Sequence, residues 1–299
     1  MTTATSILDA IVRHVDDTGF GAHGLHVRTG GDGTADDVAE HRWTPDVREE
    51  IHSAAKGVCV LATGIAADDG LVDVDEPIAD ALPGFAFGDG VEQVTLRHLL
   101  TMTSGIDMPW SATELTDWPD LAAEFLRRPS RGRVFQYANV STYTAMRVLE
   151  TRVGDVGTFV SRRLFDPLGI DDVEWSRCAN GYVAAGEGLA LRTEELARLG
   201  RLIRDGGVVD GQRIVSARWC DAMHSDWVER EGAGPGYHRY AMAGWGGPGQ
   251  LWRLHGAYGQ MLLFDDHPEG DTVVTITADD HFGADAMAAF VAEELARQR

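Results

Sequence analysis

Ser53 and Lys56 are the two residues whose types and spacing most directly indicate chemistry. They open an apolar run, Val58 to Ala67, that is typical of a buried helix, and residues three apart on a helix lie on the same face. A serine hydroxyl attacks a carbonyl when a neighbouring base takes its proton, and the neutral amine of a lysine can be that base. The start of a helix and apolar surroundings both favour the neutral amine. The pair therefore predicts a nucleophile beside its base.

Lys56 is also the only lysine in the chain, because 25 of its 26 basic residues are arginines. Arginine stays protonated in proteins, so it supplies charge but cannot take a proton from serine. A chain that otherwise uses arginine has a lysine here, which indicates that this position needs a group that deprotonates. The alternative is an S-x-x-K pattern that arose by chance.

A second motif is Tyr137-Ala138-Asn139, at a predicted junction between a loop and a helix. A tyrosine two residues before an asparagine can present a phenol and an amide to the same cleft. A phenol near Lys56 could exchange protons with Ser53 and deliver one to a leaving group. Taken alone, the motif is weak and is more typical of a packed tyrosine.

A third motif, His255-Gly256-Ala257, lies between two predicted strands. Small residues let a substrate carbonyl lie against a strand edge, where a backbone N–H can act with that of Ser53 as an oxyanion hole. The structural alternative is a glycine bulge in an edge strand.

In this order, the three motifs resemble those of the serine β-lactamase, penicillin-binding protein and family VIII esterase superfamily, especially its class C-like members. Three longer segments are also similar to that family: 96–105 (LRHLLTMTSG), 164–170 (LFDPLGI) and 188–200, which ends in LARLG. The resemblance covers 51–278. It implies an α/β (α+β) fold of the β-lactamase/transpeptidase type, with an antiparallel sheet flanked by helices and an inserted all-α domain.

The resemblance also implies an acyl-enzyme mechanism, in which Ser53 attacks a carbonyl and water later releases the acyl group. Lys56 and Tyr137 would manage the proton, and Asn139 would orient the substrate and the lysine. In the family the residue after the third motif supplies the second oxyanion N–H, which carries over to Tyr258.

The third motif departs from the family's usual K-T-G, because His255 stands in place of the lysine, as in many of the family's esterases. Recognition of a β-lactam carboxylate is therefore in doubt. We expect a serine hydrolase that cleaves a small ester or amide. An acyltransferase with the same acyl-enzyme, or a binding or scaffold protein of the same fold, are the alternatives, and the presence of Ser53, Lys56 and Tyr137 favours catalysis.

Charge and composition exclude several partners. The chain has 26 basic and 47 acidic residues, a net charge of -21, so nucleic acid and anionic membranes are not expected to bind.

The first residues lack the pattern of a signal peptide, and no apolar run reaches the length of a membrane span, so we expect a cytoplasmic protein. Neither the cysteine spacing nor the histidines form a metal motif, and we expect no metal or cofactor. The oligomeric state is not indicated.

Hydrophobic patterning divides the chain into regions. Helices are predicted at 6–15, 51–67, 96–102, 121–127, 139–153, 156–164, 193–204, 216–223 and 284–297, and strands at 24–28, 252–254, 260–264 and 272–278. We expect a discontinuous α/β domain of 1–76 and 188–299, a helical domain of 77–187, and an active site between them. Trp110 and Trp118, in a long loop of the helical region, either line a pocket or pack in the core.

Overall fold

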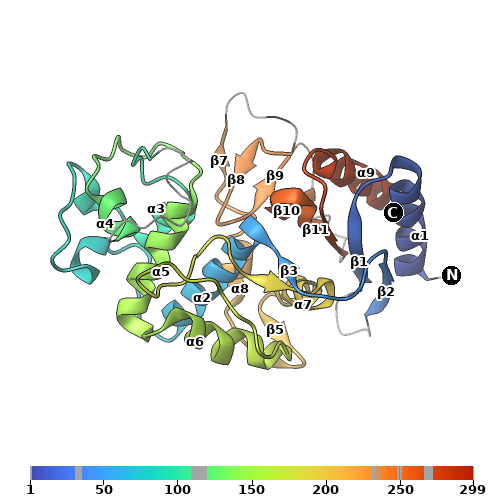
Figure 1. The fold of residues 1–299 in the computed structure, drawn as a ribbon, viewed down its shortest axis with the longest axis horizontal. Coiled ribbons are helices and arrows are strands. Elements are labelled where there is room, and N and C mark those ends of the chain that lie inside the picture. Colours follow the sequence, from blue (N-terminus) through green and yellow to red (C-terminus); the bar gives the residue numbers. More distant parts are fainter. Residues whose placement is uncertain are drawn as a thin grey trace.

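The computed structural model describes residues 2–30, 36–108, 120–230, 234, 236–247, 249, 251–265 and 272–298. The molecule has a helical part at one end and a β-sheet at the other, and both termini lie at the sheet end (Figure 1). Trp110 and Trp118 lie outside the described residues. Within the described ranges, every helix is too short or too polar to traverse a lipid bilayer.

The helices follow the predicted order closely. They are α1 (Thr3–Thr18), α2 (Ala55–Asp68), α3 (Leu96–Leu100), α4 (Leu121–Leu126), α5 (Asn139–Val153), α6 (Val156–Val160), α7 (Thr193–Arg204), α8 (Ala217–Asp221) and α9 (Ala284–Arg297). Tighter or wider turns are η1 (His52–Ala54), η2 (Ile78–Ala81), η3 (Val91–Gln93), η5 (Ser161–Phe165), η6 (Asp166–Leu168) and η7 (Ala257–Gly259). The helix predicted at 156–164 is interrupted, because α6 passes into the π turn η5. Pro167 in η6 and Gly169, in the left-handed conformation, then end the segment.

The main sheet is antiparallel throughout. Its strands are β1 (Ala22–Thr29), β2 (Asp37–Arg42), β7 (Val228–Glu229), β8 (Arg239–Tyr240), β9 (Trp245–Gly246), β10 (Leu251–Gly256), β11 (Gln260–Asp265) and β12 (Val273–Ala278). Among the described residues they pair in the order β2-β1-β12-β11-β10-β9-β8-β7. Small ladders join β3 (Glu49–Glu50) to β4 (Ala190–Leu191) and β5 (Val208–Val209) to β6 (Gln212–Arg213). The hydrophobic pattern does not predict β2, which is a charged, partly exposed strand at the sheet edge.

Alternate side chains of the sheet face two different cores. Met261 and Leu263 of β11 belong to the core formed with α1 and α9, whereas Leu262 and Phe264 belong to the core that contains α2 and α7. This period of two is the geometry of a strand that is buried on both faces. Helices therefore cover both faces of the sheet, which confirms the predicted fold class.

Helix α2 lies in the middle of the molecule, between the sheet and the helical part (Figure 1). Every residue from Ala55 to Ala66 is buried, as expected for a helix that is apolar on all sides. Gly57 lets the helix approach the sheet closely, because a Cβ there would lie 2.5 Å from Leu254 Cδ1 of β10. The start of α2 is thereby fixed against the strand that carries the third motif. The helical elements from Ile78 to Leu168 lie on its other side, and the division into domains at 77 and 187 stays a prediction.

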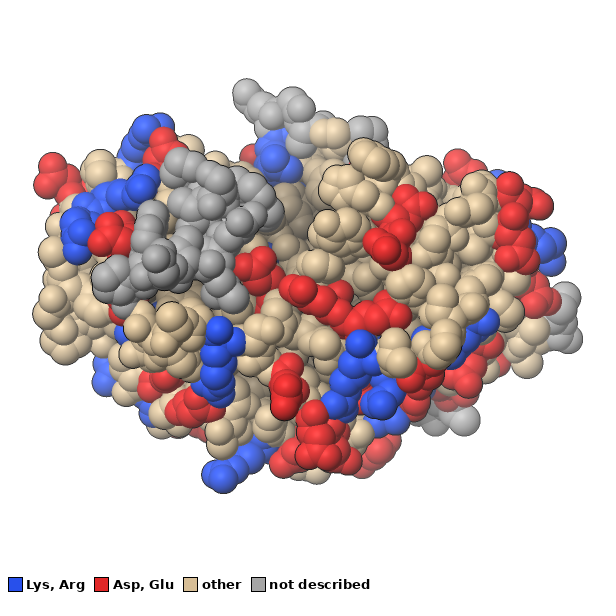
Figure 2. Space-filling view, viewed as in Figure 1, with Lys and Arg blue, Asp and Glu red and all other residues tan. Residues whose placement is uncertain are grey.

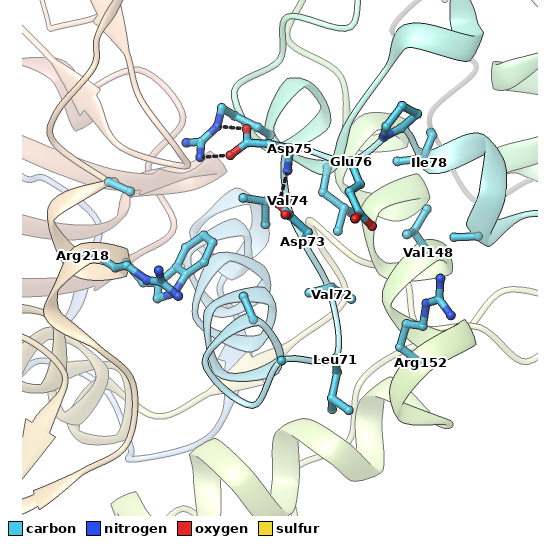
Figure 3. A pocket seen from close by; sticks show the side chains of 18 of the residues that line it. Leu71, Val72, Asp73, Val74, Asp75, Glu76, Ile78, Val148, Arg152 and Arg218 are labelled. Carbon is cyan, nitrogen blue, oxygen red and sulfur yellow. Dashed lines mark hydrogen bonds and ion pairs between the residues drawn. The ribbon is translucent and has the colours of Figure 1, made fainter.

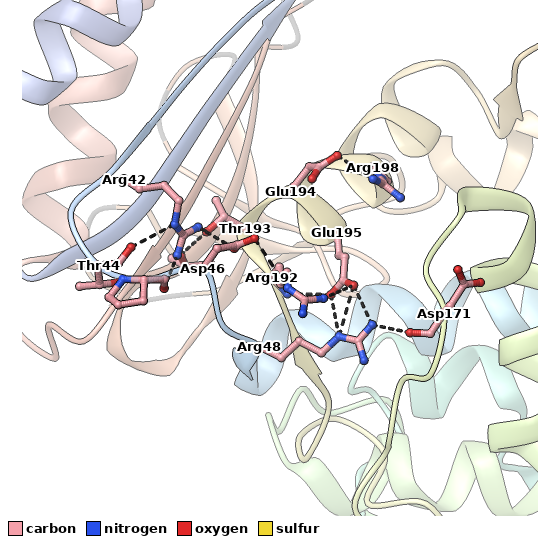
Figure 4. A network of polar contacts seen from close by, with 12 residues as sticks. Arg42, Thr44, Asp46, Arg48, Asp171, Arg192, Thr193, Glu194, Glu195 and Arg198 are labelled. Carbon is pink, nitrogen blue, oxygen red and sulfur yellow. Dashed lines mark hydrogen bonds and ion pairs between the residues drawn. The ribbon is translucent and has the colours of Figure 1, made fainter.

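A network of arginines and acids fixes the segment before η1 (Figure 4). Arg48 donates to Glu195 Oε1 of α7 at 2.7 Å and to the backbone carbonyls of Asp171 and Asp172. Burial alone would raise the pKa of Glu195, but the hydrogen bonds from Arg48 hold it below its usual value. Arg48 therefore ties α7 to the end of the helical part, immediately before β3 and the predicted nucleophile.

Candidate active site

The predicted nucleophile, Ser53, lies in the middle of the turn η1, and Lys56 lies in the first turn of α2. Lys56 Nζ is 3.0 Å from Ser53 Oγ, so the contact predicted from the spacing is present. His52, the residue before the serine, has a φ of 48°, in the left-handed region that non-glycine residues seldom adopt. Such strain is typical of functional sites held in place by the surrounding fold.

The environment of Lys56 directs its amine toward the serine. The side chain is 2% exposed, and Nζ also lies 2.6 Å from Asn139 Oδ1 and 3.0 Å from the carbonyl oxygen of Gly186. Both of these oxygens can only accept hydrogen bonds. Together with Ser53 Oγ at 3.0 Å, these two acceptors surround the amine with three oxygen atoms. The buried amine is thereby held beside that hydroxyl.

The second motif lies beside the same amine. Asn139 is the first residue of α5, and the ring of Tyr137 has its centroid 4.9 Å from Lys56 Nζ. Tyr137 also packs against Trp245, with ring centroids 5.2 Å apart, and against Tyr240 at 5.8 Å. The aromatic neighbours pack against the Tyr137 ring and hold it beside Lys56. The two residues of the motif thus converge on Lys56 from a loop and from a helix start.

The third motif approaches the site through the backbone. A Cβ on Gly256 would lie 2.2 Å from the carbonyl oxygen of Ile51, so glycine is required where β10 passes the residue before η1. His255 is half-buried on the same strand, and its ring lies 5.7 Å from that of Tyr237. Burial, with a smaller contribution from Arg253, lowers the pKa of His255 to about 3. The imidazole is therefore neutral near pH 7 and does not supply the positive charge of the lysine that it replaces.

Tyr258 lies in the turn η7 that follows β10, with a φ of 61°. Its side chain is 43% exposed, and its ring lies 5.1 Å from that of His52 and 5.5 Å from that of His281. A second strained residue therefore lies against the one that precedes Ser53. The role of the Tyr258 N–H in an oxyanion hole stays a prediction.

Two residues of the site were not predicted from the sequence, Gly186 and Glu187. The carbonyl oxygen of Gly186 accepts a hydrogen bond from Lys56 Nζ, and Gly186 has a φ of 93°. Glu187 Oε2 accepts a hydrogen bond of 2.7 Å from Asn139 Nδ2. Both lie in the loop before β4, far in sequence from the three short motifs and directly before the family-like segment 188–200. The one local signal is a glutamate between two glycines, Gly186 and Gly188, which is not specific.

Acidic side chains gather beside the site. Figure 2 shows a band of them across the middle of this face, over β3, which carries Glu49 and Glu50. Glu50 Oε1 accepts a hydrogen bond from the backbone N–H of Gly188 and lies 3.5 Å from His52 Nδ1. The edge of the site is therefore negatively charged. Among the described residues, no three histidine, cysteine or acidic side chains are grouped so as to hold a metal ion.

A cavity of about 770 Å³ lies elsewhere, at the opposite end of α2 from Ser53 (Figure 3). Its lining includes Leu71, Val74 and Trp219, but none of the predicted site residues. A helix the length of α2 spans about 20 Å, so the cavity is remote from Lys56. Arg97 in its wall is paired with Asp75 at 2.6 Å, and we assign no chemistry to this cavity.

Comparison with known proteins identifies the family to which the chain belongs. The family model described as Beta-lactamase matches residues 4–297. A 6-aminohexanoate-dimer hydrolase of Paenarthrobacter ureafaciens is 27% identical over 203 residues, which is 60% of this chain and 52% of that protein. The match thus spans about half the length of that relative.

Solved structures show the same fold. A family VIII carboxylesterase superposes with a TM-score of 0.77 at 18% identity, covering 99% of this chain and 97% of the other. The D-amino acid amidase of Ochrobactrum anthropi SV3 superposes with a TM-score of 0.72 at 16% identity, covering 98% and 99%. These findings confirm the resemblance noted from the three motifs, and the chain belongs to the Beta-lactamase family.

Proposed function

We propose that the protein is a serine hydrolase that cleaves a small ester or amide through an acyl-enzyme on Ser53. The observation that carries the proposal is the contact of 3.0 Å between Lys56 Nζ and Ser53 Oγ, with the other two acceptors of the amine fixed. An oriented neutral base next to a hydroxyl is the arrangement that activates serine as a nucleophile.

In the proposed reaction Lys56 takes the proton of Ser53 as the hydroxyl attacks the substrate carbonyl. Tyr137, whose ring is 4.9 Å from Lys56 Nζ, passes its proton to the leaving group and takes the serine proton from Lys56 in return. The backbone N–H groups of Ser53 and Tyr258 bind the oxyanion. A water then attacks the acyl-enzyme and gives one proton to Lys56, which returns it to Ser53 Oγ as the acid is released. Asn139 holds the lysine and contacts the substrate.

Two features support an uncharged acyl donor over an anionic one. The pKa of His255 is lowered to about 3, so the position of the family's third-motif lysine carries no charge near pH 7. Glu50, whose carboxylate lies 3.5 Å from His52 Nδ1, also adds a negative charge beside the residue before Ser53 and repels anions. The relatives that resemble this chain include proteins named as a carboxylesterase and an amidase, which supports esters and amides as the substrate class.

The test is intact-protein mass spectrometry after mixing with a p-nitrophenyl ester, with nitrophenol release followed in parallel. We expect a transient acyl adduct and release in the wild type, neither in Ser53→Ala, and no colour change with nitrocefin in either protein. Equal hydrolysis by Ser53→Ala would refute the proposal.

The same experiment separates the alternatives. An added alcohol or amine that appears in the product, at the expense of the free acid, would indicate an acyltransferase that shares the acyl-enzyme. The absence of both adduct and release, across a panel of esters and amides, would favour a binding or scaffold protein.

A further inference from the structure

We propose that Glu187 is a positioning residue that fixes the carboxamide of Asn139 and thereby keeps the lone pair of Lys56 directed at Ser53. The inference rests on the proposed function and adds to it a residue outside the three motifs. It is carried by a continuous chain of contacts: Glu187 Oε2 accepts from Asn139 Nδ2 at 2.7 Å, and Asn139 Oδ1 accepts from Lys56 Nζ at 2.6 Å.

The argument begins with the two ends of the asparagine amide. One end is an acceptor and the other a donor, and a rotation of the amide by half a turn exchanges them. Nothing in the bond to Lys56 alone selects between them, because a neutral amine can donate a hydrogen bond or accept one. A carboxylate on the far side can only accept, so it requires Nδ2 to face Glu187 and Oδ1 to face Lys56.

The orientation matters because of how the amine is used. With Oδ1 facing it, Lys56 donates to Asn139 and Gly186, and its lone pair is left for the Ser53 hydroxyl. With Nδ2 facing it, the amide donates to that lone pair. The base would then be occupied by Asn139 and could not take the serine proton. Glu187 therefore acts on the nucleophile through two intermediate side chains.

The location of Glu187 fits this role. Asn139 is 5% exposed and Glu187 is half-buried, so the hydrogen bond between them is partly shielded from water, where an ionised acceptor binds strongly. Glu187 follows Gly186, whose carbonyl is the other fixed acceptor of Lys56. A single short loop thus restrains the amine twice, once through its backbone and once through Asn139.

Other titratable groups also face Lys56 and do not compete for this role. They are Tyr137, His52 and Cys59. Burial lowers the pKa of His52 below its usual value and raises that of Cys59 to about 12, so both are neutral near pH 7. Glu187 is the carboxylate whose hydrogen bond reaches the partner of the amine.

The test uses the single lysine of the chain. Protein grown with carbon-13 at the lysine ε-carbon has one labelled side chain, so its chemical shift against pH follows the protonation of Lys56 alone. Both Glu187→Ala and Glu187→Gln lose the carboxylate charge, but only in Glu187→Ala is the amide free to turn and stabilise the neutral amine. We therefore expect the titration midpoint to fall further in Glu187→Ala than in Glu187→Gln. The rate of acylation, measured by intact mass, should fall about tenfold or more, with kcat affected more than KM.

Two variants provide the controls. Glu187→Gln removes the charge but keeps an oxygen that can accept from Asn139 Nδ2, so it should retain acylation within about threefold of the wild type and shift the midpoint less than the alanine variant. Glu293→Gln removes a carboxylate charge from α9, outside the site, where Glu293 pairs with Arg297. It should leave both readouts unchanged.

The outcomes separate the two proposals. An unchanged midpoint and unchanged acylation in Glu187→Ala would overturn the inference. Loss of acylation with an unchanged midpoint and a lower melting temperature would also overturn it, because Glu187 would then only stabilise the fold. If the wild type forms no acyl adduct, the proposed function fails, whereas the comparison of titration midpoints still tests the contact of Glu187 with Asn139 and Lys56.

Discussion

At the scale of single residues, the chemistry proposed for this site depends on one amine. Lys56 is 2% exposed and surrounded by three oxygen atoms, of Ser53, Asn139 and Gly186. Burial of an amine in this way is tolerated because each of its polar contacts is satisfied. A side chain that carries a fixed positive charge would satisfy the same oxygens but could not take a proton.

Lys56→Arg tests this distinction. Arginine keeps the charge and cannot deprotonate, so we expect the rate of acylation of Ser53 to fall at least about 100-fold, the lower range for loss of a general base. The measurement is the rate of adduct formation by intact mass, with circular dichroism to check the fold. Lys56→Met serves as a second variant. It removes both the charge and the base, and its side chain is smaller than that of arginine, so it fits the buried site without crowding. Acylation at the wild-type rate in either protein would contradict the role of Lys56 as the base.

The residues of the site differ in how far sequence reasoning could find them. The contact of Ser53 with Lys56 follows from local spacing, since three positions along one turn bring the side chains together. The approach of Tyr137 and Asn139 to Lys56 depends on the tertiary fold, and only the family resemblance indicated it. Glu187 lies 48 positions from Asn139 in the chain, and no periodicity or motif encodes such a contact.

At the scale of elements, the loop before β4 determines where Lys56 lies. Gly186 has a φ of 93°, and a Cβ there would lie 3.2 Å from Lys56 Nζ and 3.4 Å from Thr142 Cβ. The positive φ therefore favours glycine, and an added methyl group would press on the amine of Lys56. Gly84 has nearly the same φ, 91°, but no atom lies within 4 Å of its added Cβ. Comparing the two positions therefore separates the effect of the positive φ, which both share, from the effect of the contact with Lys56, which only Gly186 makes.

Gly186→Ala and Gly84→Ala form a matched pair. Each places alanine in a left-handed conformation, and we expect each to lower the free energy of unfolding by about 1–2 kcal/mol. Only Gly186→Ala displaces the amine, so only this variant should lose acylation. Urea denaturation gives the stabilities, and intact mass gives the acylation rates. Equal acylation by the two variants would show that the loop does not restrain Lys56.

The elements themselves were predicted to different degrees. The predicted helices at 139–153 and 193–204 coincide with α5 and α7, because each has clear boundaries. Strands β7, β8 and β9 are two residues each and carry no readable alternation, so the sheet extends further than the sequence predicts. The predicted helix from Ile51 begins instead as the 3-10 turn η1. This tighter turn is what presents Ser53 at the start of α2.

At the scale of the whole molecule, the sheet contributes buried titratable groups that make stability depend on pH. His26 of β1 alternates with Leu25 and Val27, which pack toward α1, so its own side chain faces α7. It is 4% exposed, and its Nδ1 has no hydrogen-bond partner among the described residues. Burial, assisted by the nearby charge of Arg28, lowers the pKa of His26 to about 4.

The direction of the pH effect follows from this shift. An unfolded chain protonates His26 near pH 6.5, whereas the folded protein does so only near the lowered pKa of about 4. The contribution to stability is therefore complete above pH 6.5 and is lost as the pH falls from 6.5 toward 4. At pH 5 the loss amounts to about 2 kcal/mol. Carboxylates that are ionised in both states at pH 5 add little over this range.

His26→Gln should therefore flatten the pH dependence of stability. We expect the fall in the free energy of unfolding between pH 7 and pH 5, measured by urea denaturation, to be about 2 kcal/mol smaller in this variant than in the wild type. The free energies at pH 7 and pH 5 are compared for the same protein, so a loss of stability from poorer packing of glutamine, which is present at both pH values, cancels. His281→Gln makes the same chemical change at an exposed position and should leave the fall unchanged. If His26→Gln and the wild type lose the same stability between these pH values, then His26 takes up its proton without unfolding, and the core between the sheet and α7 admits water.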